Sequence, residues 1–321
     1  MIAPSQHLQL TIQHIPVSIS SRMPELDAAL RATFADVLHT GTLGTDRAIV
    51  GSIRPFDGDR IVGSVSPSAR LVPTNDPPLD LYIDEPVLWL VDDAWGMASI
   101  DLIKQRWESW VLPGASRDPI ACVGRAAALP LACLLARRGL ALIEAAAVTR
   151  GGHTTLVLAP FGIADELAQL LRAGFGLVGA HRVLLRERSD IVEVIHVGGP
   201  APADSGYRDL AAEFCGSTVS GARCDAVLVV DPARRMLSRT TRIPAVEATG
   251  LIHRSLILPD VPELATLTRL PARLARAVPC YRVQLGQDAR GLRDLILQIQ
   301  RIESRPIQLT TFPTGKKPVA A

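Results

Sequence analysis

Residues 157–171, VLAPFGIADELAQLL, constrain the fold of this chain more than any other stretch. An apolar run ends at a turn that contains Pro160 and Gly162, and a segment with Leu167 and Leu171 at helical spacing follows. A buried strand that leads through a short turn into a helix is typical of α/β proteins. We therefore expect a sheet with helices packed on it.

The same order of strand, glycine turn and helix is the outline of a phosphate-binding loop. Such a loop ends in Lys followed by Ser or Thr, which hold a nucleotide, whereas this one has Asp165 and Glu166. At about 4 Å, one unit of charge acts on a phosphate charge with about 4 kcal/mol at an effective dielectric of about 20. Exchanging a cation for an anion therefore costs several kcal/mol of nucleotide binding. The two acids instead suit the positive end of the helix dipole, by roughly 0.3–1 kcal/mol each.

Composition excludes several classes of partner. The chain has 321 residues, of which 48% are apolar, enough for one large domain or two ordinary ones. Its 34 basic and 32 acidic residues leave a net charge of +2, so we expect neither a nucleic-acid partner nor an anionic membrane partner. Five cysteines without a C-x-x-C pair indicate reduced thiols.

Two segments bear on localisation. The first 20 residues alternate polar and apolar side chains and do not resemble a signal peptide. The most apolar run, Ala126–Ala136, has 11 residues, short of the roughly 20 that a membrane span needs. We expect a buried helix there and a cytoplasmic protein.

The first part of the chain, residues 1–115, is predicted to be an α+β domain. Its expected elements are a strand at Leu8–Ser18, a helix at Met23–Leu38, a meander of antiparallel strands in residues 48–100, and a helix at Ser99–Val111. Trp107 and Trp110 would share one face of the last helix, where they anchor a domain interface. The Pro- and Gly-containing break at residues 112–119 marks the expected boundary.

Residues 116–305 are predicted to form the second domain, and residues 306–321 a loose tail. The expected helices are Pro119–Arg138, one that follows the opening loop to about Arg172, Leu264–Ala277 and Ala289–Glu303. The expected strands are Leu140–Val148, Thr154–Leu158, more strands in Gly174–Leu185 and in Ile191–Val197, and Ala226–Asp231. The last is apolar throughout, as in a sheet that is covered on both faces.

The order of these motifs resembles the HPr kinase/phosphorylase group of phosphate-loop kinases, which belongs to the PEP-carboxykinase-like families. The resemblance spans roughly residues 100–300 and includes relatives with a different N-terminal domain. The segments that carry it are Ser99–Pro113, Ala121–Ala136, Ile143–Val148 with Gly151 and Gly152, Ala159–Glu166, Leu177–Val183 and Val278–Gly286. It implies a mixed-sheet kinase-like C-terminal domain behind a smaller α+β domain.

The residues that hold ATP and magnesium in that group are replaced in this chain. The loop of the group reads G-P-S-G-A-G-K-S; here its Lys and Ser positions match Asp165 and Glu166, and its first and last glycines match Ala159 and Ala164. Only Gly162 of the loop glycines remains in place. The aspartate pair that serves metal and base roles in the group matches Ala180 and His181, and an early His matches Glu144.

The acids also allow another chemistry. Glu144, Asp165, Glu166 and His181 would come together at the loop end of the sheet if the alignment holds. Carboxylates with an imidazole can bind a divalent metal or act as acid and base. Glu144 and His181 are then the catalytic candidates, and Asp165, Glu166 and His181 the metal candidates. The competing interpretation is a solvated helix start and an ordinary surface histidine.

These losses predict a catalytically inactive relative of the group, a pseudokinase that acts as a binding or regulatory partner of a protein or peptide. We expect no cofactor. The alternative is a divergent kinase or other transferase with a rebuilt site, which the resemblance implies would be a serine/threonine-type kinase using ATP and magnesium. A peptide-recognition module remains a third interpretation, by analogy with kinases of peptide-modification systems. Because HPr kinases assemble as hexamers, a homo-oligomer also stays open.

Overall fold

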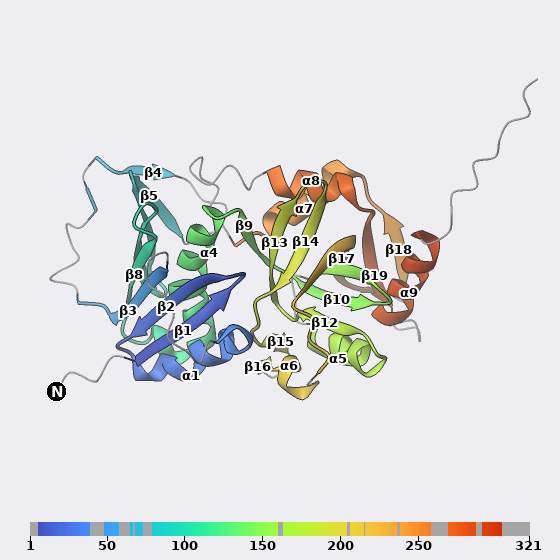
Figure 1. Ribbon diagram of the computed structural model, residues 1–321, viewed down its shortest axis with the longest axis horizontal. Coiled ribbons are helices and arrows are strands. Elements are labelled where there is room, and N and C mark those ends of the chain that lie inside the picture. The colour runs from blue at the N-terminus through green and yellow to red at the C-terminus, as the bar shows by residue number, and fades with distance from the viewer. Residues whose placement is uncertain are drawn as a thin grey trace, which may run out of the picture.

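The protein has a mixed α/β fold built on two large sheets (Figure 1). The computed structural model describes residues 6–38, 48–57, 65–66, 68–72, 79–159, 163–203, 206–214, 216–235, 238–257, 269–286 and 291–303. Within these ranges the N-terminal part forms an eight-stranded sheet, and most later strands form a nine-stranded sheet. The predicted α/β class is confirmed.

The first sheet has the strand order β1-β2-β3-β8-β7-β6-β5-β4. Its elements are β1 (Gln6–Ile12), β2 (Ile15–Ser21), α1 (Pro24–Thr33), the 3-10 turn η1 (Ala35–Val37), β3 (Ile49–Pro55), β4 (Arg70–Val72), β5 (Asp80–Asp84), β6 (Val87–Asp92), β7 (Gly96–Asp101) and β8 (Arg106–Val111). Strands β4 to β7 form an antiparallel meander within the predicted region, and β8 extends it. Strand β3 differs, because it runs parallel to both β2 and β8. The predicted strand Leu8–Ser18 is a hairpin that turns at Gln13 and His14, both with positive φ.

The predicted helix at Ser99–Val111 is wrong, because this segment is the β7–β8 hairpin. Its turn is closed by Asp101, whose Oδ1 accepts the N–H groups of Ile103 at 3.1 Å and Lys104 at 2.7 Å. Side chains alternate across a strand, so residues three apart lie on opposite faces. Trp107 is therefore buried in the main core, whereas Trp110 stacks on Trp89 on the other face, with ring centroids 6.3 Å apart.

The predicted helix at Pro119–Arg138 is confirmed as three successive pieces: α3 (Pro119–Val123), the π-helical turn η3 (Gly124–Ala128) and α4 (Leu129–Ala136). A 3-10 turn, η2 (Ala115–Arg117), precedes it, and Asp118 caps it by accepting the N–H of Ala121 at 3.1 Å. Carbonyls in a π-turn are displaced from the regular ladder. In this turn the Ala126 carbonyl accepts bonds from Trp107 Nε1 at 3.3 Å and Ser109 Oγ at 2.7 Å.

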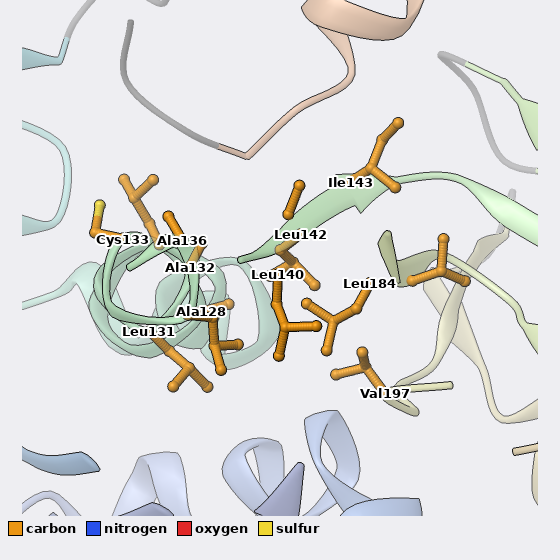
Figure 2. Packing of buried hydrophobic residues seen from close by; sticks show 14 of the residues in the cluster. Ala128, Leu131, Ala132, Cys133, Ala136, Leu140, Leu142, Ile143, Leu184 and Val197 are labelled. Carbon is orange, nitrogen blue, oxygen red and sulfur yellow. The ribbon is translucent and has the colours of Figure 1, made fainter. Parts of the chain in front are cut away.

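This helix is a core helix, as predicted. It contacts β3, β7 and β8 of the first sheet, and also β9 (Leu140–Glu144), the first strand of the second sheet. Figure 2 shows α4 beside β9, with apolar side chains around the helix and with Leu140 and Leu142 of β9 next to it. Within the described residues, Pro119–Ala136 is the one helix apolar and long enough to cross a membrane, and 78% of it is buried inside the protein.

The second sheet has the strand order β12-β10-β11-β17-β14-β13-β9, with β19 on β17 and β18 on β19. Its further strands are β10 (Ala146–Arg150), β11 (His153–Leu158), β12 (Gly176–Gly179), β13 (Arg182–Arg188), β14 (Ile191–His196), β17 (Gly221–Arg235), β18 (Arg239–Arg242) and β19 (Cys280–Gly286). A small hairpin, β15 (Ala201–Ala203) and β16 (Gly206–Arg208), lies outside it. The helices are α5 (Ala164–Arg172), α6 (Leu210–Glu213), α7 (Ala245–Arg254), α8 (Arg269–Ala277) and α9 (Leu292–Glu303).

The predicted strand Leu140–Val148 is divided between two parts of the sheet. Its first half, β9, pairs with β13, and its second half, β10, pairs with β11 and β12. The break falls at Ala145, whose N–H donates to the His181 carbonyl at 2.9 Å. The break directly follows Glu144, the one exposed and charged residue of an otherwise apolar run, and a single such residue does not show that the strand changes partner.

The apolar segment Ala226–Asp231 lies within β17, between β11 and β19, and is parallel to both, as predicted for a covered strand. Helices α5 and α9 contact each other and share one apolar cluster with β17 and β19. The helix predicted at Leu264–Ala277 is described from Arg269, and the tail at 306–321 lies outside the described residues. The boundary at residue 115 stays a prediction; the helix that follows it packs on the first sheet.

Candidate functional site

The segment that resembles a phosphate loop connects β11 to α5. Ala159 follows β11, and α5 begins at Ala164, so that Asp165 and Glu166 lie in its first turn. Gly162 lies outside the described residues. Because β11 and β17 are parallel, the start of α5 lies at the carboxyl edge of these strands, where α/β sheets commonly bind ligands.

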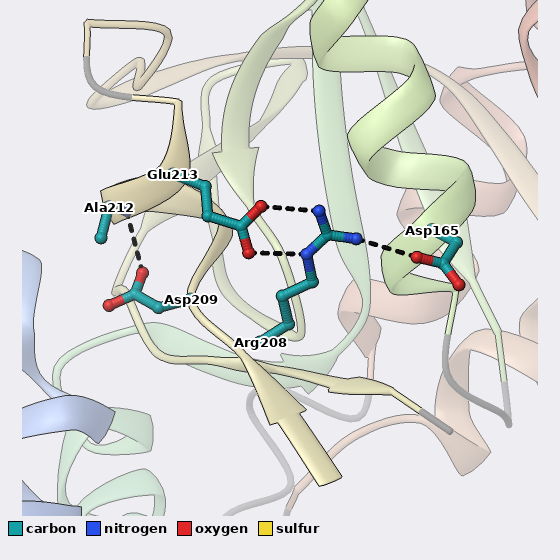
Figure 3. Close-up of polar contacts among 5 residues, drawn as sticks. All are labelled: Asp165, Arg208, Asp209, Ala212 and Glu213. Atoms are coloured by element: carbon teal, nitrogen blue, oxygen red, sulfur yellow. Dashed lines mark hydrogen bonds and ion pairs between the residues drawn. The ribbon is translucent and has the colours of Figure 1, made fainter. Parts of the chain in front are cut away.

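A cluster of three charged side chains lies at the start of α5 (Figure 3). Arg208, the last residue of β16, places Nη1 2.8 Å from Asp165 Oδ1. Its Nε and Nη2 donate to the two carboxylate oxygens of Glu213 in α6, both at 2.6 Å. Asp209 caps α6 by accepting the N–H of Ala212 at 3.0 Å. The cap holds the short helix in place, so that Glu213 can meet Arg208 with two parallel bonds.

The cluster is an internal ion pair at the position where the resemblance would place a phosphate-loop lysine. Its single guanidinium serves two carboxylates, so the group as a whole is negative and repels a phosphate. The hydrogen bonds from Arg208 lower the pKa of Glu213, and the bond to Glu213 raises the pKa of Arg208. Asp165 is well exposed, with 76% of its side chain accessible, so water screens its ion pair with Arg208.

Replacing Arg208 by Met is expected to raise the pKa of Glu213 toward its ordinary value, which carboxyl-carbon NMR titration would measure. Because Arg208 lowers this pKa in the folded state, its stabilising effect is present above the unfolded pKa and is lost as pH falls through the folded value. Arg172, a weaker influence, provides the control: Arg172→Met should move the pKa of Glu213 less. Equal shifts in the two variants would contradict the described geometry.

The positions of the aspartate pair are neutral in this structure. Ala180 is buried, and His181 follows it just before β13. Burial, together with the neighbouring charge of Arg182, lowers the pKa of His181 to about 3. The imidazole is therefore uncharged at neutral pH, and neither position supplies the anionic oxygen that magnesium prefers.

The structure brings together some of the predicted site residues. Glu144 is exposed at the end of β9, and the bond between Ala145 and the His181 carbonyl sets Glu144 and His181 on adjoining segments. Within the part of the chain that the structure describes, no group of three or more His, Cys, Asp and Glu side chains could hold a metal ion. The candidates Asp165, Glu166 and His181 therefore do not form a common site.

The described cysteines offer no nucleophile. Cys122, Cys133, Cys224 and Cys280 are free thiols and all are buried. Burial raises the pKa of Cys133 to about 12 and that of Cys122 to about 11, so the thiolate is scarce at neutral pH. Reduced thiols were the prediction, and it holds for these four residues.

Sequence reasoning missed Arg208 and Glu213. Arg208 lies 43 residues beyond Asp165, in a hairpin that no apolar pattern indicates, and their contact depends on how that hairpin folds over α5. The spacing of Arg208 and Glu213, five residues apart around a helix start, is common and specifies nothing by itself.

Of the comparisons with known proteins, only the comparison of structures gives a match. No protein-family model matches the chain, and no curated protein sequence is significantly similar to it. Among solved structures, the HPr(Ser) kinase/phosphatase from Coxiella burnetii is a weak structural neighbour. The match has a TM-score of 0.31 and 11% sequence identity, over 50% of this chain and 97% of that one. Membership in the HPr kinase group therefore stays a prediction from the sequence pattern.

Proposed function

We propose that this chain is a catalytically inactive, kinase-like protein, which acts as a binding or regulatory partner of another protein or peptide. The observation that carries the proposal is the cluster of Asp165, Arg208 and Glu213 at the start of α5. In an active phosphate-loop kinase this position presents a free cation to the nucleotide. Here the nearest described cation is bound by two carboxylates, and a phosphate would have to displace one of them.

The neutral residues before β13 support the same proposal. Phosphoryl transfer needs metal ions to neutralise the charge that builds up on the phosphate. Ala180 has no ligand atom on its side chain, and the low pKa of His181 makes it a weak base at neutral pH. The strands on either side of these residues nevertheless keep buried apolar runs, Leu177 and Val178 in β12 and Val183 to Leu185 in β13. A fold kept without the residues for phosphoryl transfer agrees with a binding role.

Calorimetric titration with ATP and magnesium tests the inactive state. We expect no saturable heat up to millimolar nucleotide and no ADP in a coupled assay. The matched variant carries Asp165→Lys with Glu166→Ser, which restores the cation and hydroxyl of a phosphate loop. It should bind ATP more tightly than the natural chain but still lack turnover, because Ala180 and His181 remain. Turnover of ATP by the natural chain would refute the proposal.

The alternative, a divergent kinase or other transferase, finds support in the adjoining positions of Glu144 and His181. It predicts an activity that Glu144→Ala and His181→Ala each abolish while the melting temperature stays nearly constant. Survival of the activity in both variants would dismiss it. In this version ATP and magnesium are the cofactors, whereas the inactive protein needs none.

A further inference from the structure

Two hollows lie at the C-terminal end of α8. The smaller, of about 260 Å³, is lined by residues 190–192 at the start of β14 and by the last turn of α8. The larger, of about 610 Å³, is lined by residues 242–245, which lead from β18 into α7, and by residues 275–280, which lead from α8 into β19. Arg276 and Ala277 line both hollows, which together are called the α8 groove. The larger volume falls within the range of about 300–1,000 Å³ that ligand pockets have.

The α8 groove has an apolar floor that is fixed by the fold. Ile243, Ala275 and Cys280 line the larger hollow and belong to the main core. Helices α7 and α8 lie side by side, and α7 begins at the groove where α8 ends (Figure 1). Val246, in the first turn of α7, is 87% exposed, and Ile191 of the smaller hollow is 36% exposed. A partner that covers these two side chains buries apolar surface, as the core of an interface does.

Two arginines of the groove lack a partner among the described residues. Arg242 and Arg276 are exposed and make no ion pair or side-chain hydrogen bond within the part of the chain that the structure describes. Asp190 is the one acidic residue that lines either hollow, so positive charge is in excess there. A guanidinium in water costs little, but it becomes unfavourable when a partner covers it without an acceptor. A molecule that docks in the groove must therefore bring acceptors.

Two acids on the elements around the groove are already bound. Arg273 donates to the Glu187 carboxylate and, at 3.1 Å, to the Ser189 carbonyl. Arg282 of β19 lies 2.8 Å from the carboxylate of Glu247, in the first turn of α7. Since both carboxylates have an arginine of their own, the two unpaired arginines of the groove are left to an outside partner.

We propose that the α8 groove docks an acidic segment of a partner protein, which places carboxylates on Arg242 and Arg276 and an aliphatic side chain against Val246 and the apolar floor. Arginine binds a carboxylate with two parallel hydrogen bonds and is among the residues that contribute most to interfaces. A purely apolar partner would bury both guanidinium groups unpaired, and a bare anion would leave the apolar floor uncovered. That the partner is a protein rests on the proposed function above, whereas the preference for acids follows from the two arginines.

The probe is a fluorescein-labelled peptide of repeated Glu-Leu-Glu-Gly units, titrated with the full chain and followed by fluorescence anisotropy. One counterpart has glutamine in place of glutamate, and the other has alanine in place of leucine. We expect saturable binding of the first peptide, no binding of the glutamine peptide and weaker binding of the alanine peptide. The affinity should fall as salt is added, because the ion pairs form at the surface.

Charge reversal tests whether the peptide occupies the groove. Arg276→Glu and Arg242→Glu should each weaken binding of the glutamate peptide by about tenfold or more, because like charges then meet. Arg22→Glu is the matched control, since Arg22 is an exposed arginine directly after β2 of the first sheet. It changes the net charge equally and should leave binding unchanged. Equal weakening by Arg22→Glu would reduce the effect to net charge and overturn the proposal.

Two further variants separate docking from a structural role. Val246→Ala should weaken the leucine peptide and not the alanine peptide, because only the former has a side chain to lay on Val246. Arg276→Met should melt at nearly the same temperature as the natural chain, since its side chain is exposed. A lower melting temperature with unchanged peptide binding would show that Arg276 serves only the end of α8, where a cation suits the helix dipole.

The peptides also decide the chemistry of the partner. Failure of the glutamate peptide to bind the natural chain, or equal binding of the glutamine peptide, would overturn the docking surface. Displacement of the peptide by an equal concentration of inorganic phosphate would assign the arginines to phosphate and likewise overturn it. ATP turnover with normal peptide binding would remove the proposed function and leave the groove standing. Absence of both turnover and peptide binding would remove the groove and leave the inactive protein.

Discussion

Replacing Trp107 by Ala is expected to lower the free energy of unfolding by about 3–5 kcal/mol. The side chain is 3% exposed and lies in the main core between the first sheet and the helix α3-η3-α4. Its ring fills the space above Gly51, where an added Cβ would lie 2.1 Å from a ring carbon. The substitution also removes the donor to the Ala126 carbonyl. Urea unfolding followed by circular dichroism would measure the loss.

Trp110→Ala is the matched control for this prediction. Trp110 stacks on Trp89 at an interplanar angle of 14°, on the face of the sheet away from the helix, and it is only partly buried. We expect a smaller loss, about 1–2 kcal/mol, mainly from the aromatic contact. A helix with both rings on one face would make the two losses similar. Equal losses would therefore contradict the hairpin.

Replacing Gly96 by Ala should be about as damaging, with a loss of about 2–6 kcal/mol. Gly96 begins β7 with φ of 131°, a backbone conformation that is nearly restricted to glycine and strained by about 1–3 kcal/mol in other residues. An added Cβ would also lie 2.0 Å from the Trp110 carbonyl oxygen, which is fixed in the ladder with β8. Overpacking against a fixed backbone adds about 1–3 kcal/mol.

Gly139→Ala separates the two contributions to this prediction. Gly139 also has positive φ, at 76°, but an added Cβ would meet nothing within 4 Å. Its expected loss is about 1–2 kcal/mol, from backbone strain alone. Comparing the two variants by urea unfolding isolates the collision at Gly96. If Gly139→Ala were as damaging as Gly96→Ala, the close approach of β8 would not be the cause.

The elements that sequence predicted best are those with a local physical signature. Strand β11 and helix α5 follow from an apolar run and from helical spacing, while the turn predicted at Pro160 and Gly162 lies outside the described residues. The central position of β17 follows from its continuous apolar character, since only a strand covered on both faces tolerates it. The helix that begins at Pro119 has proline in its first turn and an aspartate cap, and both can be recognised in the sequence.

The errors arose where one local pattern fits two structures. Apolar residues three apart in Ser99–Val111 suit a helical face, but in the hairpin they point to opposite sides of a sheet. The run Leu140–Val148 is apolar except for Glu144, and one charged residue does not by itself show that the strand changes partner at Ala145. Pairing between strands decides both cases, and it depends on residues distant in the sequence.

For the candidate site too, some features could be predicted from the sequence and others appear only in the structure. The sequence by itself gave a prediction from resemblance: Asp165 and Glu166 stand where the HPr kinase group has its phosphate-holding Lys and Ser, and Ala180 and His181 where it has an acidic pair. Only the tertiary structure decided that Arg208 binds Asp165 across 43 residues, and that Arg242 and Arg276 line one groove at the end of α8. Burial and the pairing of charges are properties of the space between elements, and they come into existence only when the sheets and helices pack.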